Sequence, residues 1–182
     1  MINNRENFIN EINSFLRSED SGMLITGNHH NEKHRLLVAL IDNYFINTTI
    51  LFRTDSMNKI TDHFRFHSMT TPKAGDIVVF GHNSYEFDAF TDSDTWLKTS
   101  NNFRVAIVYP IDQLVKKAFM LESIENLFEK KIINKVFFVS WTDCKGSDYS
   151  ILNKYVQHKC VLDSFEEYSR YFQQDSRVDV IA

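Results

Sequence analysis

Five short apolar runs without polar alternation constrain the fold of this chain more than any other feature. They cover residues 23–26, 48–52, 76–81, 104–109 and 135–141, and each is rich in β-branched or aromatic residues. A half-exposed strand alternates apolar and polar side chains, whereas an uninterrupted apolar run indicates a strand that is covered on both faces. The runs therefore predict the five buried strands of a mostly parallel sheet.

The segments between the runs have helical periodicity. After the first run, apolar side chains recur at helical spacing at Leu36, Leu37, Leu40, Ile41 and Tyr44. The same spacing predicts a long helix over 112–131 and a weaker one over 56–66. Strands that alternate with crossover helices predict an α/β fold, a three-layer αβα sandwich around a mostly parallel five-stranded sheet.

No repeat, linker or low-complexity tract divides the 182 residues, so we expect one domain, 1–182. A leading helix should lie within residues 1–21, and its apolar residues should pack against the sheet edge. Residues 22–141 should form the core. The C-terminal part, 142–182, should hold helices near 147–157 and 164–173 and an edge strand in the final "RVDVIA".

Composition narrows the class of function. The chain is 43% hydrophobic and 24% charged with a net charge of −4, which is typical of a soluble globular protein and does not favour direct nucleic-acid binding. The start lacks the apolar core of a signal peptide, and no run approaches the ~20 apolar residues of a membrane span. Cys144 and Cys160 show neither metal-ligand nor redox spacing. We therefore expect a cytoplasmic protein with two free thiols and no membrane association.

The loop "TGNHHNEKH" follows the first run and opens the first periodic helix, where open α/β sheets bind their ligands. Its layout resembles the Gly-x-x-x-x-Gly-Lys-[Ser/Thr] motif of P-loop NTPases, and the order of elements over 22–141 resembles their five-strand AAA+ type. Gly27 and Lys33 occupy matching positions, while Glu32 replaces the second glycine and His34 the hydroxyl residue. The resemblance implies a degenerate nucleotide-binding loop made of Gly27, Asn28, His29, His30, Asn31, Glu32, Lys33 and His34.

The departures from this motif predict that ATP is not a cofactor. The Glu32 carboxylate would repel a triphosphate by on the order of several kcal/mol in a partly desolvated pocket. Imidazole is a poor magnesium ligand, so His34 does not replace the missing hydroxyl. The resemblance also implies acidic residues after the third core strand, where this chain has Gly81, His82 and Asn83.

Three alternatives stay open at this point. An atypical ATPase would use Lys33 with Glu86 or Asp88 in place of the missing acid. A metal-dependent hydrolase would use the i, i+4 pairs His30/His34 and His63/His67, although neither pair has the glutamate of a zinc protease after its first histidine. The third is an α/β domain without any nucleotide history.

The interpretation that we favour is a non-hydrolysing, P-loop-like protein that binds another protein as an adaptor or regulatory subunit. The resemblance points to a larger ATPase or a DNA-processing assembly as that partner. The chain has 16 Phe and 7 Tyr, which is consistent with a docking surface. No residue is assigned a catalytic role, and no metal is expected.

Overall fold

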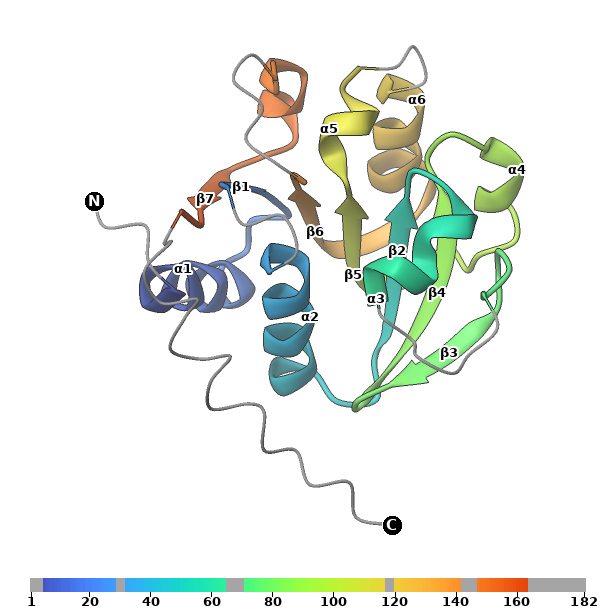
Figure 1. Cartoon of the computed structure of the whole chain (residues 1–182), viewed down its shortest axis with the longest axis horizontal. Helices are drawn as coiled ribbons and strands as arrows, with labels where there is room; N and C mark the ends of the chain where they lie inside the picture. The colour runs from blue at the N-terminus through green and yellow to red at the C-terminus, as the bar shows by residue number, and fades with distance from the viewer. Residues whose placement is uncertain (1–4, 29–31, 65–70, 117–119, 142–146, 164–182) are drawn as a thin grey trace.

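In the computed structural model, the strands of the described residues belong to one sheet (Figure 1). The structure describes residues 5–28, 32–64, 71–116, 120–141 and 147–163. The strands are β1 (Gly22–Thr26), β2 (Thr49–Thr54), β3 (Ile77–Phe80), β4 (Asn83–Ala89), β5 (Asn102–Tyr109), β6 (Ile132–Val139) and β7 (His158–Val161). Their order across the sheet is β3-β4-β2-β5-β6-β1-β7, and β3–β4 is the antiparallel pair among otherwise parallel neighbours.

Helices cover both faces of this sheet. One face carries α1 (Arg5–Arg17), α2 (Lys33–Tyr44), the 3-10 turn η1 (Met57–Lys59) and α3 (Ile60–Phe64). The other carries α5 (Ile111–Leu114), α6 (Met120–Glu125), its π-helical continuation η2 (Asn126–Lys130) and the 3-10 helix η3 (Ser150–Lys154). A short helix, α4 (Ser93–Trp96), follows β4. The predicted α/β class is confirmed.

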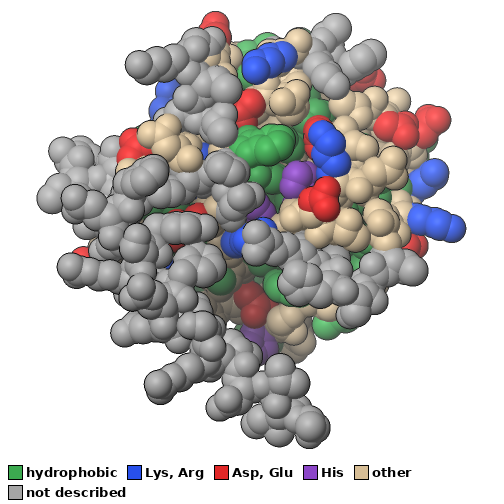
Figure 2. All heavy atoms as spheres, viewed as in Figure 1, with side chains coloured by type: hydrophobic (Ala, Val, Ile, Leu, Met, Phe, Trp, Pro, Cys, Tyr) green, Lys and Arg blue, Asp and Glu red, His purple; other side chains and the backbone are tan. Residues whose placement is uncertain are grey.

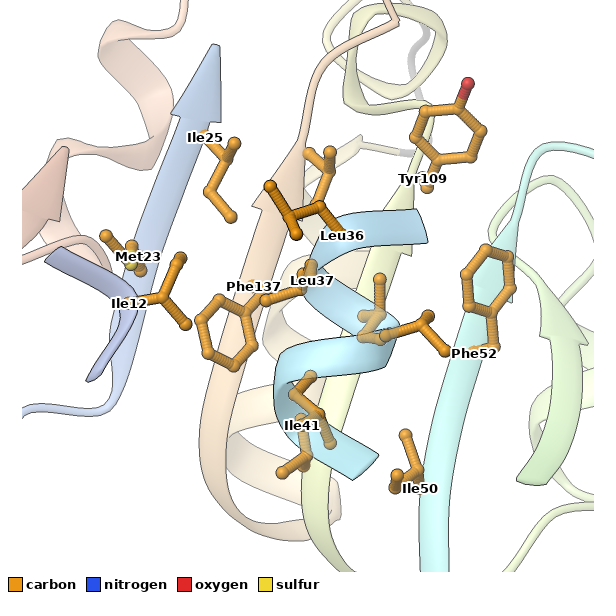
Figure 3. Packing of buried hydrophobic residues seen from close by; sticks show 14 of the residues in the cluster. Ile12, Met23, Ile25, Leu36, Leu37, Ile41, Ile50, Phe52, Tyr109 and Phe137 are labelled. Atoms are coloured by element: carbon orange, nitrogen blue, oxygen red, sulfur yellow. The ribbon is translucent and has the colours of Figure 1, made fainter. Parts of the chain in front are cut away.

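Alternation along the buried strands divides the core into two halves. On β2, Ile50 and Phe52 face α2, whereas Leu51 lies in the half that α5 and α6 cover. Figure 3 shows Leu37 and Ile41 of α2 packed among buried side chains of the strands. Each such side chain contributes about 1.5–3 kcal/mol when fully buried, so this contact anchors α2 on the sheet.

The sheet has seven strands within the described residues, so the expected number of five was wrong. The run at 76–81 forms β3, which is an antiparallel edge strand and not a buried parallel one. Ile77 and Val79 are 65% and 73% exposed, because β3 has a neighbour on one side and its face is not covered. The strand that occupies the inner position is β4, whose sequence "NSYEFDA" carries polar side chains that the apolar pattern did not identify.

The expected helices are confirmed in part. The leading helix is α1, and its Phe15 ring lies 5.1 Å from Phe137 of β6 and 5.2 Å from His158 of the edge strand β7. The helix expected over 112–131 is divided into α5, α6 and η2. The segment 147–157 contains η3 in place of a longer helix, and the unexpected strand β7 follows it. The helix expected over 164–173 and the final edge strand lie outside the described residues.

Candidate functional site

The loop after β1 begins at Gly27, at the carboxyl end of the sheet. Its φ of +121° lies in a region that glycine tolerates and other residues rarely adopt. A Cβ atom here would stand 2.2 Å from the carbonyl oxygen of Leu162, just after β7. Glycine is therefore required because two chain segments cross closely at this point. That requirement accounts for Gly27 without reference to any ligand.

Lys33 is the first residue of α2, and its side chain is fully buried. Side chains in a helix lean toward its N-terminus, so the Lys33 ammonium reaches back under the loop. There it donates to the carbonyl oxygen of Gly27 and, at 3.1 Å, to that of Trp141. The ammonium thus joins the chain after β1 to the chain after β6. Lys33, which sequence analysis placed in a degenerate nucleotide-binding loop, thus cross-links two segments of the chain.

Asp163 is a participant that sequence analysis missed. Its Oδ1 accepts a hydrogen bond from the backbone N–H of Asn28 at 3.0 Å. An amide at the start of the loop is therefore already bound to a carboxylate of the same chain. Asp163 follows β7, which brings it to the same end of the sheet as β1. An acidic residue directly after a predicted strand would have identified Asp163 as a candidate. Sequence analysis did not predict β7, so this candidate was missed.

His34 is buried against the core. Its ring stacks on Tyr109 at a centroid distance of 4.2 Å, and its Nε2 lies 2.9 Å from the carbonyl oxygen of His63. The position that should have carried a magnesium-binding hydroxyl is thus part of the packing between α2, α3 and β5. Burial and the nearby negative charge of Asp112 raise the pKa of Tyr109 well above its ordinary value.

A small ionic group lies next to these rings. Asp55 follows β2 and contacts Lys59 at 2.5 Å, and its Oδ1 lies 3.7 Å from Nε2 of His63. Burial acts to raise the pKa of Asp55, but the contacts with His63, Lys59 and Thr54 outweigh it and lower the pKa to about 2. The Asp55 carboxylate therefore stays ionised at neutral pH and links the end of β2 to Lys59 of η1 and His63 of α3.

Glu86 and Asp88, the acids of the atypical ATPase alternative, project from β4 on the face opposite α2. Asp88 binds the guanidinium of Arg53 with two contacts of 2.7 Å, and both side chains are fully buried. Glu86 accepts from the backbone N–H and the hydroxyl of Ser100 at 2.7 and 2.6 Å. Asp88 therefore links β4 to β2, and Glu86 links β4 to the segment before β5. Both carboxylates lie on the face of the sheet opposite α2.

Arg53 also contacts the π-helical turn η2 and the helix before it. Its guanidinium donates to the carbonyl oxygen of Ser123 at 2.9 Å and to Oδ1 of Asn126 at 2.8 Å. Asn126 is the first residue of η2, so the wider turn presents its amide to the buried charge. A buried guanidinium needs such partners, because an unpaired charge in the core costs several kcal/mol.

Asp112 is a second acid that sequence analysis did not single out. It lies just after β5, is nearly fully buried, and accepts the Tyr149 hydroxyl at 2.7 Å through Oδ1. Its Oδ2 accepts the backbone N–H of Trp141. Asp112 thus fixes Trp141, the residue after β6 whose carbonyl oxygen accepts a hydrogen bond from the Lys33 ammonium.

The remaining sequence candidates divide between described and undescribed positions. Glu32 directly precedes α2, and its carbonyl oxygen accepts the N–H of Leu36 at 2.8 Å. His29, His30, Asn31, His67 and Cys144 lie outside the described residues. Within the described parts of the chain, no three metal-ligating side chains are grouped for a metal ion. Cys160 is buried, and burial raises the pKa of its thiol to about 12.

Comparison of the chain with family models, with curated proteins and with solved structures gave no match.

In the described ranges, no helix combines the length and the apolar character that crossing a membrane requires. On the described part of the face shown in Figure 2, Lys and Arg side chains lie among Asp and Glu and do not gather in one basic patch.

Proposed function

We propose that this chain is a protein-binding adaptor or regulatory subunit whose P-loop-like loop does not turn over nucleotide. The observation that carries this proposal is the position of Lys33. Its ammonium is buried and donates to the carbonyl oxygens of Gly27 and Trp141. A lysine that holds a phosphate must direct its charge to the ligand, and here that charge is directed to the backbone.

The loop amides support the same proposal. A phosphate-binding loop needs its backbone N–H groups free to cradle the anion. In this chain the Asn28 N–H is engaged by the Asp163 carboxylate, and Glu32 adds a second carboxylate at the N-terminus of α2. An incoming triphosphate would have to displace one negative group and approach another, which opposes binding.

Protein is the favoured partner class because of the charge distribution. The net charge is −4, and the face in Figure 2 mixes both signs, whereas nucleic-acid binding draws on concentrated positive charge. The partner that fits the P-loop resemblance is a subunit of a larger ATPase or of a DNA-processing assembly. The chain would then contribute binding and leave turnover to its partner.

Calorimetric titration with ATP–Mg²⁺ tests the nucleotide part of this proposal. We expect no binding heat at 1 mM nucleotide for the wild type, for Lys33→Ala, or for the control Lys159→Ala, whose residue lies in β7. Micromolar binding that is lost in Lys33→Ala and kept in Lys159→Ala would overturn the proposal in favour of an atypical ATPase. The adaptor role is tested by affinity purification from the native source, followed by measuring the ATPase rate of the captured assembly with and without the chain.

A further inference from the structure

A pocket of about 500 Å³ lies at the amino ends of β5 and β6. The ends of α1 and α2 and the two strands supply its lining, which includes the basic residues Arg17, Arg104 and Lys135 and the aromatic residues Tyr44 and Phe45. The loop of Lys33 follows the carboxyl end of β1, and β1 runs parallel to β6. The pocket and that loop therefore lie at opposite ends of the sheet.

Lys135 gives the pocket a fixed positive charge. The residue is 7% exposed, and its ammonium donates to the carbonyl oxygens of Phe15, Ser18 and Asp20 at 3.0, 2.7 and 2.6 Å. Because α1 ends at this point, the ammonium also offsets the partial negative charge of a helix C-terminus. Among the described residues, no carboxylate forms an ion pair with Lys135, so its charge is not neutralised by a side chain.

Two guanidinium groups add to this charge. Arg17 is the last residue of α1 and Arg104 lies on β5, and both are exposed. The Arg104 guanidinium lies 5.4 Å from the centroid of the Phe45 ring, and this contact restricts its position. In the described part of the chain, neither guanidinium forms an ion pair or a hydrogen bond. Both groups can therefore bind an acceptor from outside the chain.

The acidic side chains near the pocket do not balance these charges. Glu19 is the acidic residue among the described lining residues, and it is exposed. The carboxylate of Asp20 instead contacts His158 of β7 at 2.7 Å. Three basic residues thus line the pocket with one acidic residue, although the whole chain has a net charge of −4. A positive concavity of this kind attracts anions.

We propose that this pocket binds an acidic segment of the partner protein, and that Arg17 and Arg104 each bind one of its carboxylates. A guanidinium offers two parallel N–H donors, which match the two oxygens of a carboxylate. Arginine and tyrosine are enriched where proteins contact each other, and the third exposed side chain here is Tyr44, at 39%.

A protein segment suits these residues better than a small free anion. Arg17 and Arg104 come from different elements and are exposed, so ordering both around one small ion costs side-chain entropy. A segment with several carboxylates can contact both guanidinium groups at once, and the second contact is then intramolecular. The inference rests on the proposed function, because it assigns a surface of this chain to the partner of the adaptor.

Fluorescence anisotropy of a fluorescein-labelled hexaglutamate peptide tests the site on the full chain. We expect a dissociation constant on the order of 100 μM at about 50 mM NaCl, and at least fivefold weaker binding at about 300 mM, where exposed charges are screened. Arg17→Glu and Arg104→Glu should each weaken binding about tenfold. The matched control is Lys98→Glu, which changes the net charge equally at an exposed residue outside the pocket and should alter binding less than twofold. Glu19→Gln should strengthen binding about twofold, because it removes the acidic side chain from the lining.

Several results would overturn the inference. The wild type may fail to bind the peptide at about 1 mM protein, or the three charge reversals may weaken binding equally, which would show a general effect of net charge. Inorganic phosphate that displaces the peptide at micromolar concentration would assign the pocket to a small anion. Tighter binding of an oligonucleotide of six thymidines would assign it to nucleic acid.

The two proposals fail in different experiments. If the peptide does not bind but the chain still changes the ATPase rate of the captured assembly, the pocket is not the docking site and the adaptor role stands. If ATP–Mg²⁺ binds in calorimetry at the loop of Lys33, the proposed function fails whatever the peptide titration shows.

Discussion

Replacing Lys33 by methionine should destabilise the protein although it removes a buried charge. Lys33→Met keeps most of the aliphatic chain and deletes the ammonium that donates to the carbonyl oxygens of Gly27 and Trp141. A hydrogen bond from a charged donor contributes about 1.5–3 kcal/mol, and each orphaned buried acceptor costs about 1–3 kcal/mol. Part of this loss is offset, because the ammonium no longer has to be desolvated. We expect a net loss of about 1.5–3 kcal/mol in the free energy of unfolding.

Urea unfolding followed by circular dichroism at pH 7 measures this loss. With a typical dependence of about 1–3 kcal/mol per molar urea, the midpoint should fall by roughly 1 M. The control is Lys159→Met, because Lys159 is exposed and its contact with Asn153 is a surface hydrogen bond of 3.2 Å. Its effect should stay within about 0.5 kcal/mol. If Lys33→Met behaves like the control, the lysine is not an internal cross-link and the reasoning is refuted.

Three further predictions concern the other charged groups. Arg53→Met should cost about 3–5 kcal/mol, because it leaves the Asp88 carboxylate buried and unpaired, while Arg53→Met with Asp88→Leu should recover most of that loss in the same urea assay. Asp55→Asn should cost about 1–2 kcal/mol at pH 7 and close to nothing at pH 2. The lowered pKa of Asp55 adds stability above its unfolded value of 3.8, and this stability is lost as the pH falls toward about 2. Glu32→Gly with Asp163→Ala should create millimolar ATP affinity in calorimetry, since it removes one carboxylate and frees the Asn28 amide.

Each of these predictions has a clear contrary result. A double variant at Arg53 and Asp88 that is no more stable than Arg53→Met would show that the unpaired Asp88 carboxylate is not the cause of the lost stability. A stability difference for Asp55→Asn that persists unchanged to pH 2 would exclude the ionic origin of the effect. If the variant without Glu32 and Asp163 shows no heat with ATP, while Lys33→Met is destabilised as expected, repulsion is not what opposes the nucleotide.

The sequence predicted β1, β2, β5 and β6, because burial on both faces leaves an uninterrupted apolar pattern. It misjudged β3, since "IVVF" has the same pattern although Ile77 and Val79 are exposed at a sheet edge. An apolar run therefore does not show whether another element covers the strand. It missed β4 because the buried Asp88 is compensated by Arg53, a residue 35 positions away, and local patterns cannot show such pairing.

The sequence predicted where the loop between β1 and α2 lies, but not the contacts that its residues make. The spacing from Gly27 to Lys33 identified the loop, and the structure does place that loop at the carboxyl end of β1. What Lys33 binds depends on Trp141, which is 108 residues away, and the engagement of Asn28 depends on Asp163. Both contacts arise because β6 and β7 flank β1, and that adjacency could not be derived from the spacing of a motif.

A crystal grown in 10 mM ATP–Mg²⁺ tests the central claim most directly. The account predicts that Nζ of Lys33 remains on the carbonyl oxygens of Gly27 and Trp141, and that the loop carries no triphosphate. A triphosphate seated on the amides that precede Lys33, with Nζ turned away from those carbonyls and onto a phosphate oxygen, would contradict it.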